Sequence, residues 1–211
     1  MPIFERNGEK VLFIHIPKTG GTAIEEYFSS ESTMTFLGMH PSPSLKICPQ
    51  HFTVTDLKVL LGSDYWSMAC AVIRDPYKRM ESEFFFRTED QFNKFGQRPD
   101  FSSWLIDRMN QVRRNPLFLD NHFRPQIEFI DSDITIFRFE EGLEIVIDEI
   151  SRVLGINKIT SLQHKNVSSK KDIKWSLDAL HCVNQYYRSD FKEFGYPMKK
   201  LNLNFFVNRT K

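Results

Sequence analysis

The sequence predicts an α/β fold, with a P-loop-type central parallel sheet flanked by helices. Short runs rich in β-branched and aromatic residues alternate with stretches of helical periodicity, which is typical of this class. Two of these runs, VLFIHI at 11–16 and ACAVIR at 69–74, are almost continuously apolar, as expected for strands that are covered on both faces. The first run ends in a glycine turn, PKTGGT, that leads into a predicted helix.

The same patterns give the order of the elements along the chain. Strands are predicted at 11–16, about 33–37, 68–74 and 134–139. Helices are predicted at 22–29, 54–61, 77 to about 87, 101–113, 143–154 and 173–191. Gly155 can end the fifth helix, and the polar stretches at 41–49 and 88–99 predict loops. Since there are no repeats and no low-complexity linker, we expect one domain over residues 1–211.

Composition limits the classes of function. With 211 residues and 41% hydrophobic residues, the chain can form one substantial core. Its net charge of +1 does not favour general nucleic-acid binding, so any anion must be held by a local group of basic residues. Cys48, Cys70 and Cys182 are too few and too scattered for a disulfide framework or a zinc site.

The N-terminal residues do not resemble a signal peptide, and no apolar run approaches the length of about 18 residues that a membrane-spanning helix needs. For a chain that is the full product, this predicts a soluble, cytoplasmic protein. The sequence leaves the oligomeric state open.

The segment PKTGGT at 17–22 has the features of an anion-binding loop. Its two glycines allow a sharp turn, and the first amides of the next helix point at whatever lies in front of them. Lys18 would add a positive charge and Thr22 a hydroxyl donor. In the nucleotide-hydrolase pattern GxxxxGK[ST] the lysine follows the glycines, whereas Lys18 precedes them. The alternative is an ordinary strand–turn–helix junction with a lysine there by chance.

A second candidate anion site lies in AVIRDPYKRMES at 71–82. Arg74 ends a buried strand, at the sheet edge where ligands bind in open α/β folds. Asp75 can cap the next helix and Pro76 suits its first turn. Ser82 follows eight residues after Arg74, on that helix. The alternative is a charge at a strand end that simply reaches water.

The first of these segments, in the form IHIPKTGGT, resembles the 5′-phosphosulfate loop of the sulfotransferases that use 3′-phosphoadenosine 5′-phosphosulfate (PAPS). The likeness is to the carbohydrate-type branch, which includes heparan and chondroitin sulfotransferases. It implies that the donor is bound by the loop residues Pro17, Lys18, Thr19, Gly20, Gly21, Thr22 and Ala23. The second segment is similar to the family's 3′-phosphate motif, which implies that Arg74 and Ser82 bind that phosphate and that Arg79 supports the loop.

Further segments extend the resemblance over most of the chain. HKNVSS at 164–169 resembles the loop that closes over the nucleotide, which implies that Asn166 and Ser168 contact the donor. NHFRPQ at 121–126 is similar to the N-H-x-x-P-Q segment, and we expect His122, Arg124 and Gln126 at the acceptor. YYRSDFKEFGYP at 186–197 matches the terminal pattern.

The implied reaction moves a sulfuryl group from PAPS to an acceptor hydroxyl, expected to be that of a carbohydrate, by in-line displacement and without a metal. Lys18 would stabilise the leaving phosphate oxygen, and a histidine suits the role of base near pH 7. Of the six histidines, His51 is favoured, because it stands just before a predicted helix between the two PAPS motifs. His122 is the rival, and His15 is expected to be structural.

Two other classes of function remain open. A P-loop kinase or nucleotide hydrolase would require ATP and magnesium, and a catalytically silent protein would bind 3′-phosphoadenosine 5′-phosphate (PAP) only. The expected partners are thus a nucleotide donor and a hydroxyl acceptor, with no nucleic acid and no membrane. The aromatic residues between 84 and 104 are either core or a platform for a sugar.

Overall fold

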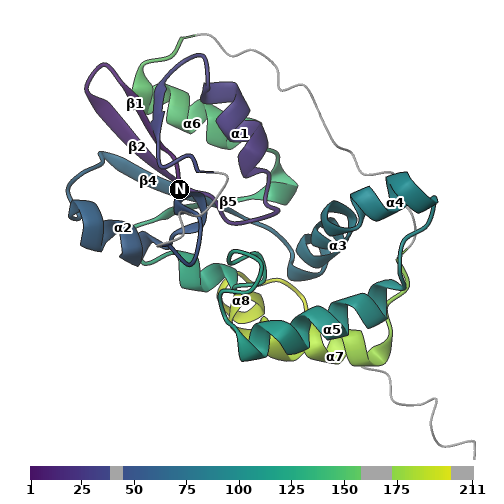
Figure 1. Cartoon of the computed structure of the whole chain (residues 1–211). Helices are drawn as coiled ribbons and strands as arrows, with labels where there is room; N and C mark the ends of the chain where they lie inside the picture. Colours follow the sequence, from purple (N-terminus) through teal and green to yellow (C-terminus); the bar gives the residue numbers. More distant parts are fainter. Residues whose placement is uncertain (39–44, 158–172, 201–211) are drawn as a thin grey trace, which may run out of the picture. The chain divides into compact units, whose positions relative to one another are not determined.

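The computed structural model describes residues 1–38, 45–157 and 173–200. Its centre is a five-stranded sheet in the order β3-β1-β2-β4-β5 (Figure 1). The strands are β1 Ile3–Arg6, β2 Glu9–Ile14, β3 Thr33–Thr35, β4 Met68–Ile73 and β5 Thr135–Arg138. Helices flank the sheet, so the predicted α/β class is confirmed.

The sheet is mixed. β2, β4 and β5 run parallel, with Ile14 beside Ala71 and Ile73 beside Arg138, and these are three of the four predicted strands. β1 pairs antiparallel with both β2 and β3 and was not predicted, because a run as short as IFER has little pattern of its own. Asn7 and Gly8 join β1 to β2 with φ of 54° and 86°, as a tight hairpin requires.

The main core lies between one face of the sheet and two helices. α1 Gly21–Phe28 and α6 Glu144–Leu154 supply apolar residues to it, and α2 Val54–Leu61 lies on the other side of the sheet (Figure 1). The helices end where the sequence predicts, with a Thr53–Asp56 capping box before α2 and Gly155 after α6. The fully buried members of this core are Phe4, Val11, Phe13, Ile24, Phe28, Cys70, Val72, Val146 and Ile150.

The chain divides into two compact units. The first joins Met1–Arg74 with Gln111–Lys170 and holds the whole sheet, and the second joins Asp75–Asn110 with Lys171–Lys211. The second unit holds α3 Pro76–Arg87, α4 Glu89–Phe95, most of α5 Phe101–Arg114, α7 Leu177–Tyr186 and α8 Arg188–Glu193. One domain over the whole chain stays a prediction.

Two predictions for the second unit were wrong in detail. A helix, α4, occupies part of the predicted loop at 88–99, where Glu89 and Asp90 provide an acidic first turn and Gly96 ends the helix with φ of 70°. The predicted helix at 173–191 is two helices, which meet at Tyr187. Tyr187 is fully buried and the guanidinium of Arg79, also fully buried, lies over its ring.

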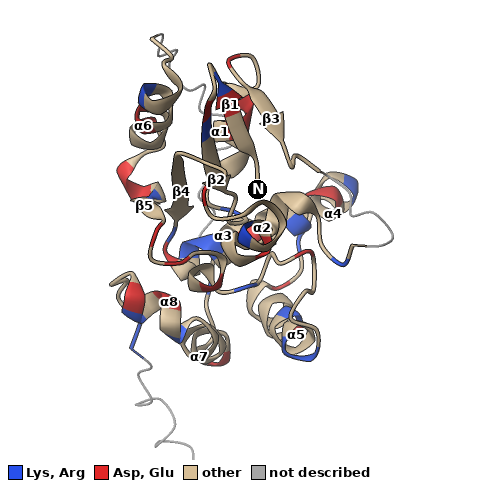
Figure 2. Ribbon diagram, turned by 90° about the vertical axis from the view of Figure 1, so that its left-hand side faces the viewer, with Lys and Arg blue, Asp and Glu red and all other residues tan. Residues whose placement is uncertain are grey.

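Basic and acidic residues are intermixed along the described part of the chain. Figure 2 shows Lys and Arg spread over several elements and interspersed with Asp and Glu, in keeping with the net charge of +1. Among the described residues, no helix is both long enough and apolar enough to cross a membrane.

Candidate active site

Three side chains follow directly on the ends of the three parallel strands. His15 follows β2, Arg74 follows β4 and Phe139 follows β5. Because parallel strands end at the same edge of a sheet, these residues share one edge of the first unit. The predicted loop and second anion site therefore meet there.

The loop after β2 has the backbone that the sequence predicts. Lys18 and Gly20 both have positive φ, 70° and 92°, and the Thr19 hydroxyl donates to the Ile16 carbonyl oxygen across 2.8 Å. α1 begins at Gly21, so the amides of Gly21 and Thr22 have no acceptor within the helix, whereas the Ala23 amide donates to the Gly20 carbonyl oxygen across 3.1 Å. These amides and the positive end of the helix dipole favour an anion in front of the loop.

Gly20 is packed against two side chains that follow β5 in the chain. A Cβ atom at Gly20 would lie 2.8 Å from Cδ1 of Leu143 and 3.1 Å from the ring of Phe139. Together with the positive φ, this contact admits only glycine without a shift of the neighbours. The loop is thus fixed against the residues that follow β5.

Arg74 is joined to the same loop. Its Nη1 donates to the carbonyl oxygen of Lys18 across 3.1 Å, and its guanidinium lies over the Phe139 ring, 4.1 Å from the centroid. Both anion-binding candidates therefore belong to one connected group, with the guanidinium half-buried beside the loop backbone.

The backbone of Arg74 is held by the side chain of Gln126. Gln126 Oε1 accepts from the Arg74 amide across 2.9 Å, and Gln126 Nε2 donates to the Arg74 carbonyl oxygen across 2.8 Å. Gln126 is fully buried at the start of the short 3-10 helix Gln126–Phe129. Its position makes it a support for Arg74, a role that the sequence did not indicate.

His51 lies at the end of the short 3-10 helix Pro49–His51 and forms a pair with Asp120. His51 Nδ1 is 2.7 Å from Asp120 Oδ2, and the other carboxylate oxygen accepts from the Cys48 amide across 2.6 Å. A carboxylate partner at Nδ1 fixes the tautomer in which Nδ1 carries the hydrogen. Nε2 is then the nitrogen that can accept a proton.

Burial sets the electrostatics of this pair. His51 is 8% exposed, and desolvation lowers its pKa below the usual histidine value, although the hydrogen bond to Asp120 opposes this shift. Burial alone would raise the pKa of Asp120, but the hydrogen bonds from His51 and from the Cys48 amide outweigh it and hold that pKa well below its usual range. Near pH 7 the result is a neutral imidazole beside an ionised carboxylate, which is the arrangement a general base needs.

The turn that carries Asp120 has an unusual backbone. Leu119, Asp120 and Asn121 have φ of 52°, 60° and 63°, a run of three residues in the left-handed region without a glycine. Such residues persist where surrounding contacts fix them. Here the side-chain Nδ2 of buried Asn121 donates to the His51 carbonyl oxygen across 3.0 Å. The turn therefore contacts the His51 ring through Asp120 and the His51 backbone through Asn121.

Two further histidines flank His51. The centroid of the His122 ring is 5.0 Å from that of His51 and the centroid of His15 is 5.5 Å away, with interplanar angles of 89° and 79°. Among the described residues, no group of three His, Cys, Asp or Glu side chains is placed to hold a metal. Arg124, two residues after His122, is half-buried and pairs with Glu128 across 3.0 Å.

The other predicted residues fall in different places. Pro17, Thr19 and Gly21 are buried, Ala23 is half-buried and Thr22 is exposed on the first turn of α1. Ser82 lies half-buried on α3 and belongs to the second unit, whereas Arg74 belongs to the first. Asn166 and Ser168 lie outside the described residues.

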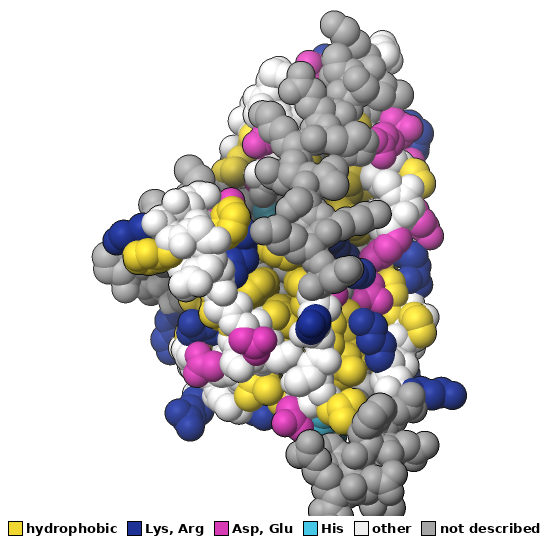
Figure 3. All heavy atoms as spheres, turned by 90° about the vertical axis from the view of Figure 1, so that its right-hand side faces the viewer, with side chains coloured by type: hydrophobic (Ala, Val, Ile, Leu, Met, Phe, Trp, Pro, Cys, Tyr) yellow, Lys and Arg dark blue, Asp and Glu magenta, His cyan; other side chains and the backbone are white. Residues whose placement is uncertain are grey.

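The aromatic residues of the second unit are divided between core and surface. Phe84, Phe101 and Trp104 are buried, whereas Phe86 and Phe95 are 53% and 62% exposed. Figure 3 shows one face of the molecule, on which hydrophobic side chains emerge in small groups between charged ones. The buried members belong to the core, and an aromatic platform for a sugar stays a prediction.

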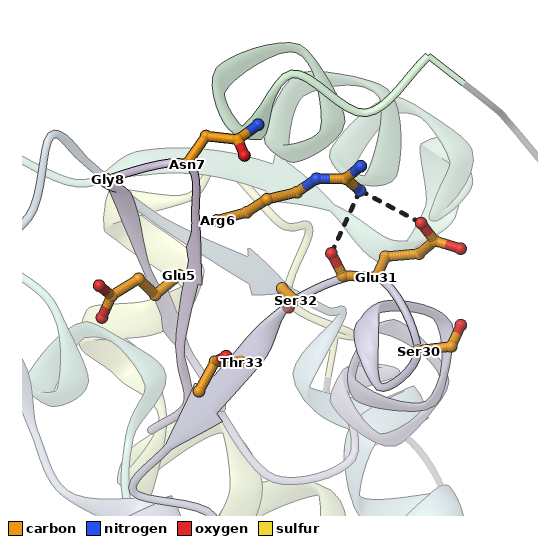
Figure 4. Close-up of a pocket in the computed structure, with 8 residues that line it drawn as sticks. All are labelled: Glu5, Arg6, Asn7, Gly8, Ser30, Glu31, Ser32 and Thr33. Atoms are coloured by element: carbon orange, nitrogen blue, oxygen red, sulfur yellow. Dashed lines mark hydrogen bonds and ion pairs between the residues drawn. The ribbon is translucent and has the colours of Figure 1, made fainter.

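A separate surface pocket lies at the other end of the sheet. It is lined by the β1–β2 turn and by the residues after α1, and in Figure 4 Arg6 reaches across to Glu31, which it contacts at 3.2 Å. The pocket lies at the start of β2 and at the end of α1, whereas the anion loop joins the end of β2 to the start of α1. The pocket is therefore remote from the anion loop.

Sequence reasoning missed the partners of the predicted residues. Asp120 gave no signal beyond its place just before the NHFRPQ segment, and Gln126 was expected at the acceptor rather than beside Arg74. Asp120 is 69 positions from His51, and Gln126 is 52 positions from Arg74. Helix and strand periodicity report local neighbours only, so such pairs need the folded chain.

The chain was also compared with protein families, curated proteins and solved structures. A family model described as the sulfotransferase family matches residues 3–197, which covers nearly the whole chain. Comparisons with curated proteins and with solved structures give no significant match.

Proposed function

Because the chain belongs to the sulfotransferase family, we propose that it transfers a sulfuryl group from PAPS to a hydroxyl group of a carbohydrate. The observation that carries this proposal is the single sheet edge at which Lys18, Arg74 and the His51–Asp120 pair are assembled. A loop that carries a lysine, an arginine bonded to the backbone of that loop and a neutral base suit a donor with two phosphate positions and a hydroxyl that must lose its proton.

In this proposal the loop holds the 5′-phosphosulfate. The amides at the start of α1 and the Lys18 ammonium bind its oxygens, with Thr22 as a further donor. Arg74 takes the 3′-phosphate together with Ser82, and its bond to the Lys18 carbonyl keeps the two binding groups in register. Asn166 and Ser168 are proposed to contact the nucleotide from the later segment.

The reaction is an in-line displacement at sulfur. The acceptor hydroxyl oxygen forms a bond to sulfur while the bond from sulfur to the bridging phosphate oxygen breaks. His51 Nε2 takes the hydroxyl proton, and Asp120 stabilises the imidazolium that forms. The electron pair of the broken bond stays on the phosphate oxygen of PAP, where Lys18 and the loop amides stabilise the developing charge.

The acceptor would lie on the His122 side of His51. His122 is 9% exposed and perpendicular to the His51 ring, and Arg124 is close to it in sequence and half-buried. A hydroxyl-rich acceptor suits such a mixture of imidazole and guanidinium donors. The carbohydrate class rests on the resemblance of the loop and of the NHFRPQ segment to the carbohydrate-type branch.

Binding of PAP compared with ATP and magnesium tests the donor. A ligand at about 100 times its dissociation constant adds roughly 2.7 kcal/mol, or on the order of 5–10 °C in melting temperature at this size. We expect that shift with PAP, and we expect it to be lost in Arg74→Ala. The matched control is Arg152→Ala, an exposed arginine of the first unit that pairs with Glu149.

Transfer of radiolabelled sulfate from PAPS to a panel of neutral and acidic glycans tests the reaction. Label in a glycan product, lost in Lys18→Ala, would support the proposal. A thermal shift with ATP and magnesium alone would replace it with a kinase or hydrolase. A shift with PAP but no transfer to any hydroxyl acceptor would indicate a silent PAP-binding protein.

A further inference from the structure

A second buried histidine–carboxylate pair lies beside the base and has no part in the reaction described above. His15 Nδ1 is 2.5 Å from Glu25 Oε1, and both side chains are 7% exposed. The other oxygen of Glu25 accepts from Gln50 Nε2 across 2.8 Å. Burial alone would raise the pKa of Glu25, but the hydrogen bonds from His15 and Gln50 outweigh it and lower the pKa, so the carboxylate stays ionised.

One side of the His15 ring contacts the anion loop. A Cβ atom at Gly21 would lie 2.8 Å from each of three ring atoms, Cγ, Cδ2 and Cε1. Gly21 is the first residue of α1, and its amide belongs to the turn that faces the anion. The ring therefore packs directly behind the anion-binding amides, and only glycine allows it to come so close.

The same ring also contacts the base. Its centroid is 5.5 Å from that of His51, at an angle of 79°, and Gln50, which holds Glu25, is the residue before His51. One imidazole thus lies between the group that would hold the leaving phosphate and the group that would take the proton. Close packing transmits a shift of either side to the other.

We propose that His15, held by Glu25 and Gln50, is a positioning residue that sets the distance and orientation between the anion loop and the His51 ring. The proposal rests on the proposed function, because in-line transfer needs the base, the acceptor oxygen and the leaving group in fixed alignment. An apolar residue could fill the same volume, but it could not be oriented by a buried carboxylate.

The test follows the ring nitrogens of His51 by ¹⁵N NMR, first in the free protein and then with PAP. The spectra are compared for the wild type, His15→Ala and Glu25→Gln, the last of which keeps the volume of the carboxylate and removes its charge. Ile24→Val is the matched control, because Ile24 is fully buried on the same helix and has no polar link to His51. Melting temperature is measured for each variant to identify loss of folding.

We expect the ratio of the two His51 tautomers in the free protein to change at least about threefold in His15→Ala and Glu25→Gln, a size typical of coupling between packed residues. PAP should shift the His51 nitrogens in the wild type and in Ile24→Val, and less in the other two. With an accepted glycan, kcat should fall on the order of 10²-fold while the KM for PAPS changes little, as misalignment predicts.

His51 signals that coincide in the wild type and in both folded variants would overturn the proposal. If His15→Ala does not fold, the His51 signals of Glu25→Gln decide the test, because that substitution keeps the side-chain volume. If PAP does not bind the wild type, the proposed donor is wrong, and the tautomer comparison in the free protein still decides whether His15 orients His51.

Discussion

Arg74 donates a hydrogen bond from Nη1 to the backbone carbonyl oxygen of Lys18 across 3.1 Å, although the two residues are 56 positions apart in the sequence. The contact exists because β2 and β4 are parallel neighbours, so the residues that follow them lie side by side. It holds the Arg74 side chain against the backbone of the predicted anion loop.

Replacement of Arg74 by lysine should weaken PAP binding about 10- to 100-fold, since a charged hydrogen bond contributes about 1.5–3 kcal/mol. Lysine keeps the charge but lacks the planar fork that reaches Lys18 while it lies over Phe139. Isothermal titration calorimetry with PAP measures the loss, with Arg152→Lys as the control. An affinity within about threefold of wild type would show that charge alone suffices.

Gln126→Met should destabilise the fold by roughly 2–4 kcal/mol, because it leaves the Arg74 amide and carbonyl without the Gln126 side chain. Methionine has a similar volume, so packing changes little. Urea unfolding followed by circular dichroism measures the change. Gln91→Met, at an exposed position of α4, should be nearly neutral, and equal effects of the two substitutions would contradict the proposed support role.

His51→Ala should lower turnover at least ~100-fold, the lower range for loss of a general base, with little change in PAP affinity. Asp120→Asn should also lower turnover, because an amide NH2 can favour the wrong tautomer of His51. Turnover and PAP binding are measured side by side. His181→Ala, at an exposed position of α7, is the control, and near-normal turnover in His51→Ala would leave His122 as the candidate base.

Turnover should fall at acid pH with a midpoint below about 6.5, the ordinary histidine value, since burial lowers the pKa of His51. Stability should fall in the same direction. Below about pH 6.5 the unfolded chain takes up a proton at His51 before the folded chain does, so acid favours unfolding.

The pKa of Asp120 is also lowered in the folded protein. The ionised Asp120 carboxylate therefore stabilises the fold above about pH 4, and this stabilisation is lost as the pH falls through the pKa that Asp120 has in the folded protein. Melting temperatures between about pH 2 and pH 8 measure the sum of these effects. In His51→Phe the loss of stability just below about pH 6.5 should shrink, and an unchanged slope there would exclude His51 as its source.

Gly20→Ala should destabilise the protein by about 1–3 kcal/mol more than Gly62→Ala. Both glycines have positive φ, 92° and 85°, so alanine is strained at each position. Only at Gly20 would the new Cβ meet Leu143 and Phe139, whereas nothing lies within 4 Å of it at Gly62. Urea unfolding of the two variants separates the contact from the backbone strain, and equal losses would show that Leu143 can move aside.

The sequence predicted the parallel strands and the helix ends because local signals specify them. Continuous apolar runs at 11–16 and 69–74 mark strands covered on both faces, and Gly155 marks the end of α6. The short strand β1 and the helix α4 were not predicted, because four and seven residues are too few to show a clear hydrophobic period.

For the site, the sequence indicated the loop, Arg74 and His51, but not what holds them. Asp120, Gln126 and Glu25 act through contacts across 69, 52 and 10 positions, and no spacing rule brings such pairs together. The roles of Ser82 and of the acceptor residues stay predictions.

The long sequence separation of these pairs has a consequence for how the protein acquires activity during folding. The His51 ring cannot be oriented until the turn at Leu119–Asn121 has docked beside it, and the Arg74 backbone is not held until Gln126 is in place. Contacts this distant in sequence form late, because loop closure must come first. During refolding, nucleotide binding should therefore be regained with the last step of tertiary assembly rather than with the early gain of helix, which makes the ligand a reporter of the finished fold.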